Sequence, residues 1–277
     1  MWRLALPRLG KYMKNNELTL AGLLLTVILT GCGGSSDTTQ ITDVADASST
    51  DTGTDTAAPA FLHDAYSEFE QDNVVALLDG YDVVIETNGL PNHTSPYWSP
   101  SHALFSEPYV TSYEQMAPGY IDDFNGMYTL TVPAVPELAN SSSATGLGAI
   151  GIAVSGAMIY NDEEGPGVPL DSAAGSLDYN GAHTGPQSYH YHLEPIAWSE
   201  DDSNLIGVMA DGFFLYGRKC NSTGAYPTDL DVSGGHSSIT QHAIDPEYHY
   251  HIQNELYINA YYILFPGDYQ GTANAIR

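Results

Sequence analysis

Basic residues are scarce in this chain of 277 residues: 7 lysines and arginines stand against 34 aspartates and glutamates, for a net charge of −27. Four of the basic residues, Arg3, Arg8, Lys11 and Lys14, lie close to the N-terminus, so the remainder is almost wholly acidic. An acidic surface repels the phosphates of nucleic acids and of anionic membranes. Nucleic acid is therefore excluded as a partner, whereas cations are attracted.

Cysteine is nearly absent, since only Cys32 and Cys220 occur. Exported proteins normally use cysteines in disulfide pairs. If Cys32 carries a lipid, as argued below, Cys220 has no partner in the chain. We interpret Cys220 as a buried thiol that packs like a small apolar residue. A disulfide to a second chain and a metal ligand are the open alternatives.

Common catalytic signatures are missing as well. The sequence holds no H-E-x-x-H, no G-x-S-x-G, no phosphate-binding loop and no dinucleotide fingerprint. These absences argue against the common hydrolases, kinases and dehydrogenases.

The N-terminal segment has the pattern of a bacterial lipoprotein signal. A positive region precedes the short apolar stretch Leu18 to Leu29, and Leu29-Thr30-Gly31-Cys32 resembles a lipobox. We expect residues 1–31 to be a signal peptide and an acylated Cys32 to anchor the protein in a lipid bilayer. Since Gly33 gives no aspartate retention signal, we expect an outer-membrane or periplasmic location.

Residues 32–60 are rich in Ser, Thr, Asp, Gly and Ala and have almost no large apolar side chain, so we expect a disordered tether. Residues 61–277 are long enough for one domain with a sizeable core. Residues 61–80 are the best helix candidate. Short β-rich runs at 81–89, 126–135, 149–160, 204–217 and 259–267 are bounded by turn residues. They predict a mainly β, β-sandwich-like single domain with few short helices.

Three ordered matches indicate an internal duplication. "IGIAVSGAMIYN" from Ile150 aligns with "IGVMADGFFLYG" from Ile206, "LDYNGAH" from Leu177 aligns with "LDVSGGH" from Leu230, and each pair is followed by a Y-H-Y-H run. We therefore interpret residues 150–193 and 206–252 as repeats that pack together with pseudo-twofold symmetry.

These stretches, with "GAHTGPQSYHYHLEP" and "SGGHSSITQHAIDPEYHYH", resemble the YHYH-domain family of exported bacterial proteins. The family has no settled activity. The resemblance implies a cysteine three residues before each G-x-H histidine, where this chain has Asn180 and Ser233. The paired loss fits a disulfide in other members; if those cysteines bind metal instead, the site is altered here.

The paired histidines favour a metal site. In a strand, alternate side chains share a face, so His190 with His192, and His249 with His251, can converge on one ion. The glycine-rich loops add His183 and His236. Three histidines with an open position form the ligand set of zinc and copper centres. The alternative is an aromatic ladder that only supports the sheet.

The metal is copper or zinc on this reasoning. Calcium is an alternative with little support: Asp229, Asp231 and Ser233 precede Gly234 as in an EF-hand loop, but Thr240 stands where that loop needs a glutamate.

Asp211 is the candidate catalytic residue. It lies where the first repeat has Ser155 and is a metal ligand, a residue that orients a ligand, a general base, or a turn aspartate before Gly212.

Together these features predict a cell-envelope lipoprotein that binds a transition metal for metal capture or for a metal-dependent reaction. Two other functions stay open. One is a hydrolase or glycan-active enzyme without metal, which uses histidine and Asp211. The other is an adhesion or binding module with structural histidines. The protein or glycan partner is not specified by the sequence.

Overall fold

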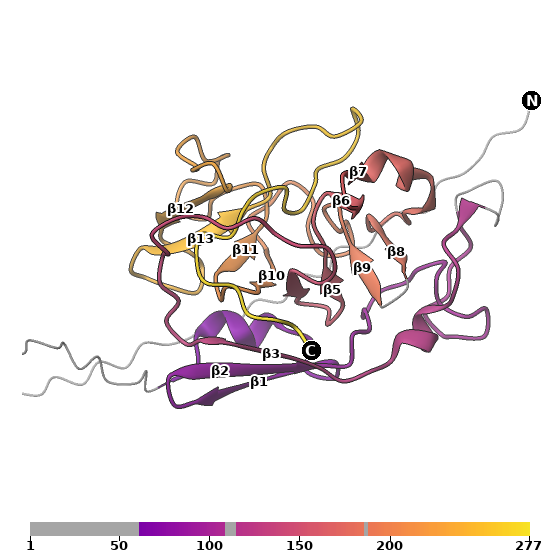
Figure 1. The fold of residues 1–277 in the computed structure, drawn as a ribbon, viewed down its shortest axis with the longest axis horizontal. Helices are drawn as coiled ribbons and strands as arrows, with labels where there is room; N and C mark the ends of the chain where they lie inside the picture. The colour runs from indigo at the N-terminus through magenta and orange to yellow at the C-terminus, as the bar shows by residue number, and fades with distance from the viewer. Residues whose placement is uncertain (1–60, 109–114, 186–187) are drawn as a thin grey trace, which may run out of the picture. The chain divides into compact units, whose positions relative to one another are not determined.

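Short strands separated by turns form most of the regular structure (Figure 1). The computed structural model describes residues 61–277 except 109–114 and 186–187. The expected signal peptide 1–31, the tether 32–60 and the acylated Cys32 lie outside the described residues. Four 3-10 helices occur in the described part: η1 (Asp64–Glu68), η3 (Ile121–Phe124), η4 (Leu170–Ser172) and η5 (Ala174–Ser176). No helix among the described residues is both long enough and apolar enough to cross a membrane.

A three-stranded antiparallel sheet has the order β1-β2-β3. Its strands are β1 (Val74–Asp79), β2 (Asp82–Thr87) and β3 (Tyr128–Pro133). Along β2, buried Val83, Ile85 and Thr87 alternate with more exposed residues, which is the pattern of a sheet with one face in the core.

A larger sheet of eight strands has the order β12-β13-β11-β10-β4-β5-β9-β8. Its strands are β4 (Gly151–Ala153), β5 (Met158–Ile159), β8 (Ala182–Thr184), β9 (Tyr189–Tyr191), β10 (Leu205–Met209), β11 (Phe214–Tyr216), β12 (Gly235–Ser238) and β13 (Glu247–His251). A small hairpin is made by β6 (Glu163–Gly165) and β7 (Val168–Pro169).

The two halves of the eight-stranded sheet have the same topology. In one half β4 and β5 are antiparallel, β9 runs parallel to β5, and β8 is antiparallel to β9. In the other half β10, β11, β13 and β12 repeat these directions in the same order. An antiparallel pairing of β4 with β10 joins the halves. The halves coincide with the two predicted repeats, while their origin by duplication stays a prediction.

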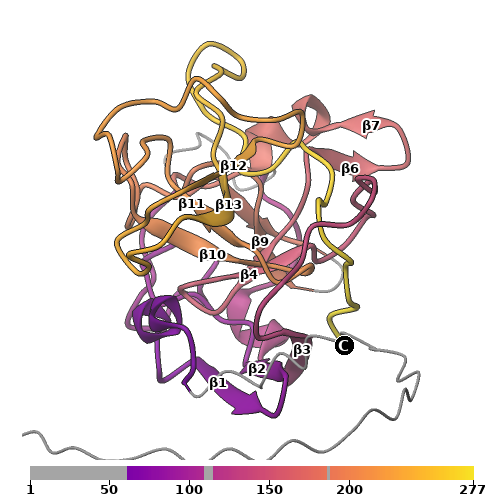
Figure 2. The same cartoon turned by 90° about the vertical axis from the view of Figure 1, so that its left-hand side faces the viewer.

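One core lies between the sheets. It contains Ile85 and Leu130 from the small sheet together with Ile152 and Val208 from the large one. The small sheet lies along one side of the large sheet in both views (Figures 1 and 2). A buried hydrogen bond of 2.6 Å from the Thr87 hydroxyl to the Gly156 carbonyl links them. The mainly β single domain predicted from the sequence is confirmed.

Two local predictions were wrong. Residues 61–80, expected to be helical, form only the short η1 and then strand β1, because the apolar Val74 to Leu78 run pairs with β2. The run at 259–267, expected to be a strand, makes only isolated bridges, such as Leu193 with Ile263.

Candidate metal centres

Each Y-H-Y-H run places its histidines and its tyrosines on opposite faces of a strand, as the alternation predicts. His190 and His192 have ring centroids 4.9 Å apart, and Tyr189 and Tyr191 have theirs 5.5 Å apart. The second run behaves alike, with 4.9 Å between His249 and His251 and 5.4 Å between the rings of its tyrosines.

The tyrosine hydroxyls have partners at equivalent positions in the two halves; the Tyr248 hydrogen bond is exposed and the other three are buried or partly buried. The first tyrosine of each run donates to a loop aspartate, and the second meets a residue of the β4–β5 or β10–β11 turn. The pairs are Tyr189 with Asp178 (2.7 Å), Tyr248 with Asp231 (2.7 Å), Tyr191 with Ser155 (2.9 Å) and Tyr250 with Asp211 (2.6 Å). These hydrogen bonds hold each strand in register and thereby fix the direction of its histidines.

A glycine turn positions the third histidine of each half. Gly181 and Gly234 adopt positive φ values of 67° and 82° in equivalent turns. A Cβ on Gly181 would stand 2.3 Å from the Leu193 Cβ, so this turn requires glycine. The chain then enters β8 or β12, where His183 pairs directly with His190, and His236 with His249.

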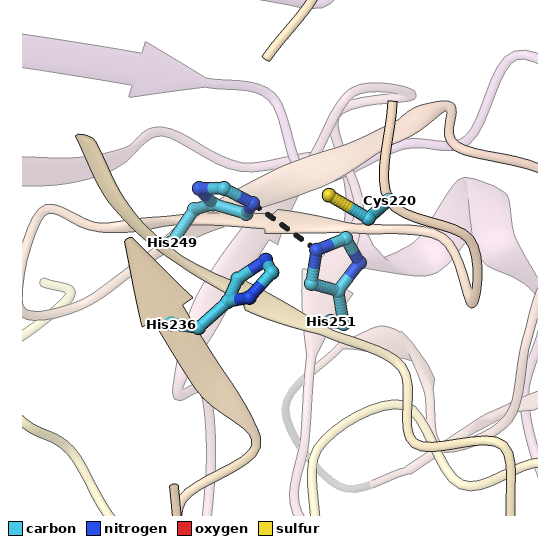
Figure 3. A group of neighbouring side chains, drawn as sticks. All are labelled: Cys220, His236, His249 and His251. Atoms are coloured by element: carbon cyan, nitrogen blue, oxygen red, sulfur yellow. Dashed lines mark hydrogen bonds between the residues drawn. The ribbon is translucent and has the colours of Figure 1, made fainter. Parts of the chain in front are cut away.

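The structure thus brings the six predicted histidines together as two groups of three. The first cluster is His183, His190 and His192 with Glu164, and the second is His236, His249 and His251 with Cys220 (Figure 3). Nε2 of His183 lies 3.0 Å from that of His190, and Nε2 of His249 lies 3.1 Å from that of His251. Two nitrogens on one tetrahedral ion with bonds of about 2.0 Å stand about 3.3 Å apart. The observed spacing is therefore close to that of a ligand set.

The first cluster holds all three imidazoles with Nδ1 outward. Nδ1 of His190 faces the Ser188 carbonyl at 3.1 Å, and Nδ1 of His192 faces the Asn161 carbonyl at 2.6 Å. Nδ1 of His183 meets the Ser176 hydroxyl at 2.8 Å, and that hydroxyl donates its own proton to Ala173. Each Nδ1 must therefore carry the proton, so each neutral ring turns an Nε2 lone pair to the centre.

The second cluster repeats this arrangement. Nδ1 of His249 faces the Glu247 carbonyl at 2.9 Å, and Nδ1 of His251 faces the Gly217 carbonyl at 2.7 Å. Nδ1 of His236 lies 2.9 Å from a carboxylate oxygen of Asp229. The lone pairs of His249 and His251 consequently face each other without a proton between them. A cation bound between the rings satisfies such a contact.

Glu164 is the candidate fourth donor of the first cluster, since it lies near two of its three histidines. Its Oε1 lies 3.4 Å from Nε2 of His192 and 3.5 Å from that of His183. Oε1 of Glu164 and Nε2 of His192 are both buried without a hydrogen-bond partner among the described residues. Burial raises the pKa of the Glu164 carboxyl. A bare acceptor that faces another acceptor is unfavourable, and a metal ion resolves it.

Cys220 supplies the fourth donor of the second cluster. Its thiol is free and buried, as expected, but it also lies within 4.8 Å of the donor atoms of the three histidines (Figure 3). Burial alone would raise the pKa of this thiol, yet contacts of 3.1 Å with the Ser222 and Ser238 hydroxyls contribute to holding it below its ordinary value. Thiolate is the form that binds metals.

Burial keeps the imidazoles neutral. Desolvation, aided by the neighbouring His192, lowers the pKa of His183 to about 3, and desolvation lowers that of His192 to about 4. Desolvation likewise brings His249 to a pKa of about 4 and His251 to a pKa of about 3. Neutral imidazole is the ligand form of histidine, so these four side chains have the protonation state that metal binding needs near neutral pH.

Sequence reasoning missed Glu164 and favoured a packing role for Cys220. The sequence does hold a signal for both residues. The two repeats align Ile150 with Ile206 at an offset of 56 residues, and at the same offset Glu164 aligns with Cys220. The same offset carries Ser155 onto Asp211.

Asp211 lies apart from both groups of three histidines. Its carboxylate accepts hydrogen bonds from the Tyr250 hydroxyl and from the Gly271 and Phe213 amides. These contacts give Asp211 a positioning role on Tyr250. Asp229 and Asp231, considered for calcium, are engaged with His236 and with Tyr248 respectively.

The positions where the family resemblance implies cysteine have other partners here. The Asn180 amide donates to the Thr94 carbonyl and contacts His93, while the Ser233 hydroxyl accepts from Gln270.

Comparison with known families gives one result. The model of a family described as "YHYH protein" matches residues 129–228. This stretch runs from the second residue of β3 to beyond β11 and includes the whole first cluster and Cys220, while the second Y-H-Y-H run lies beyond it. The resemblance to the YHYH family is therefore confirmed over residues 129–228. Comparisons with curated proteins and with solved structures gave no match.

Proposed function

We propose that this protein is an exported metalloprotein that binds one transition metal ion in each cluster. The observation that carries the proposal is the convergence of unprotonated donors. In each half, three Nδ1 atoms have partners outside the cluster. In the first half the Glu164 carboxylate lies near Nε2 of two histidines, and in the second half the Cys220 thiol lies within 4.8 Å of the donor atoms of all three. Structural histidines do not need this arrangement, because they would pair a donor with an acceptor.

The donor sets favour copper or zinc. Imidazole binds both metals, and a thiolate selects Cu(I) or zinc over hard cations. The second cluster, with three imidazoles and Cys220, fits either of them. The first cluster replaces sulfur by the Glu164 oxygen, which suits Zn²⁺ or another divalent ion more than Cu(I).

Metal content of the purified protein tests the proposal. We expect about two ions of copper or zinc per chain by elemental mass spectrometry, after loading where necessary. The variant His190→Ala/His192→Ala should lose one ion and keep the other, and His249→Ala/His251→Ala should show the converse. His102→Ala is the matched control, since this histidine stacks on Trp98 away from both clusters. Full retention of metal in both double variants would overturn the proposal.

The cellular location belongs to the same proposal. Leu29-Thr30-Gly31-Cys32 supports acylation of Cys32 and attachment to the lipid bilayer of the cell envelope. Mass analysis of the N-terminal peptide should find diacylglycerol on Cys32, and Cys32→Ala should release the protein from membranes. A membrane-bound Cys32→Ala protein would contradict the lipid anchor.

A further inference from the structure

The two clusters differ in their access to small molecules. A cavity of about 990 Å³ is lined by Glu164, His183, His190 and His192, which are all four donors of the first cluster. The histidines of both clusters are buried, so the clusters differ in their fourth donors: the Cys220 sulfur of the second cluster is buried as well and lies 3.1 Å from the hydroxyls of Ser222 and Ser238. Structural metal sites are closed by protein ligands, whereas sites that bind substrates keep a position open beside a cavity.

The candidate fourth donor of the first cluster is also more exposed to solvent than that of the second. The side chain of Glu164 is 19% exposed and projects from the short β6–β7 hairpin. It contacts two of the three imidazoles through a single oxygen. Cys220 is only 1% exposed and lies within 4.8 Å of the donors of all three. A carboxylate at a cavity wall can turn away from an ion, while an enclosed thiolate cannot.

The cavity wall indicates which molecules fit. Its large side chains include Met116, Phe124, Leu147 and Tyr160, and its charged ones are Glu163 and Glu164. No lysine or arginine occurs among the described lining residues. Anions therefore find no cationic partner there except the metal itself, and two carboxylates repel them. A neutral molecule with an apolar body and one lone-pair donor atom matches this wall.

We propose that the first cluster is an open metal centre which takes a neutral, largely apolar small molecule as an exchangeable ligand, whereas the second cluster is a closed centre. This inference rests on the proposed function, since it requires metal in the first cluster. It assigns a binding site for organic ligands to the cavity beside β8 and β9 and a structural role to the ion near β12 and β13.

Cobalt(II) spectroscopy tests the inference with defined probes. The full chain is loaded with Co²⁺, bound cobalt is counted, and visible absorption is recorded during titration with imidazole, 4-phenylimidazole or azide. We expect imidazole to change the spectrum of one of two bound ions. 4-Phenylimidazole should bind about tenfold more tightly, because its ring buries apolar surface. Azide should bind most weakly.

Variants assign the response to a cluster. In His249→Ala/His251→Ala the spectral change should persist, and in His190→Ala/His192→Ala it should vanish. Two bound cobalt ions without a response to any probe, a response that follows the second cluster, or tightest binding by azide would each overturn this inference while the proposed function stands. Failure to bind any cobalt, copper or zinc would overturn the proposed function, and this inference with it.

Discussion

At the scale of single residues, the Y-H-Y-H run divides two tasks between neighbouring side chains. The histidines turn Nε2 to a cluster centre, while the tyrosines on the other face are held by Asp178, Asp231, Ser155 and Asp211. The hydrogen bonds of the tyrosines fix the position of each strand, so that the imidazoles on its other face lie close together. Replacement of a tyrosine should therefore change the stability of the fold, whereas replacement of a metal ligand should change the properties of the bound metal.

Loss of the Tyr250 hydroxyl should reduce stability. In Tyr250→Phe the Asp211 carboxylate loses a donor at 2.6 Å and the Gln270 amide loses its acceptor at 2.7 Å. Because these groups are buried or partly buried, we expect a cost of about 1–3 kcal/mol in the free energy of unfolding. Urea denaturation measures it. Tyr81→Phe, at an exposed tyrosine, is the control and should change stability by less than about 0.5 kcal/mol.

Replacement of Cys220 should change the spectrum of the second cluster. With Co²⁺ bound there, the wild-type protein should show a thiolate-to-cobalt charge-transfer band in the near ultraviolet, because the sulfur is in ligand position. Cys220→Ser should abolish that band and leave the absorption of the first cluster unchanged. The Glu164→Gln variant serves as the comparison and should retain the band. A band that survives in Cys220→Ser would remove Cys220 from the ligand set.

At the scale of strands, the antiparallel pairing of β4 with β10 is the seam between the halves. Gly207 lies at this seam, and a Cβ there would stand 2.3 Å from the Ile152 carbonyl oxygen and 2.9 Å from the Ala153 Cα. The backbones approach too closely for a side chain. The seam therefore depends on glycine at this position.

Gly207→Ala should destabilise the whole domain. Overpacking of backbone against backbone costs about 1–3 kcal/mol or more, so the thermal midpoint should fall, as measured by circular dichroism. Gly175→Ala is the matched control, since a Cβ on Gly175 meets no atom within 4 Å. Equal stability of the two variants would show that β4 and β10 can move apart without loss of stability.

The elements also show what the sequence can predict. The alternation in Y-H-Y-H has the period of a strand, so both faces of β9 and β13 could be predicted locally. Glu164 could not be found in this way, because the β6–β7 hairpin brings its carboxylate to His183 and His192 through tertiary contacts. The 61–80 run was misread since pairing with β2, which is not local information, decided between helix and strand for Val74 to Leu78.

At the scale of the whole molecule, the charge is one-sided. After residue 60 the chain has three basic residues, Arg218, Lys219 and Arg277. Two of them are already paired, because Arg218 lies 2.8 Å from Glu194 and Lys219 lies 2.9 Å from Asp201. The remaining carboxylates repel one another across the surface.

Salt should therefore stabilise the metal-free protein. The screening length falls from about 30 Å at 0.01 M to about 3 Å at 1 M, which removes most of the repulsion between surface carboxylates. We expect the thermal midpoint to rise steadily with sodium chloride, as followed by calorimetry with a chelator present. A midpoint that falls with salt would mean that attractive ion pairs outweigh the net charge.

Strands β8 and β12 stand at the two ends of the eight-stranded order, and each contributes one histidine opposite a histidine of its neighbour. An ion bound by such a pair would hold a short edge strand, of three residues in β8 or four in β12, against its neighbour in the sheet. Without the ion these edge strands would separate more readily from the sheet. The next strand would then expose unpaired backbone N–H and C=O groups, which can pair with another chain. A newly made chain in a metal-poor environment would then be prone to self-association until an ion is bound at each end of the sheet.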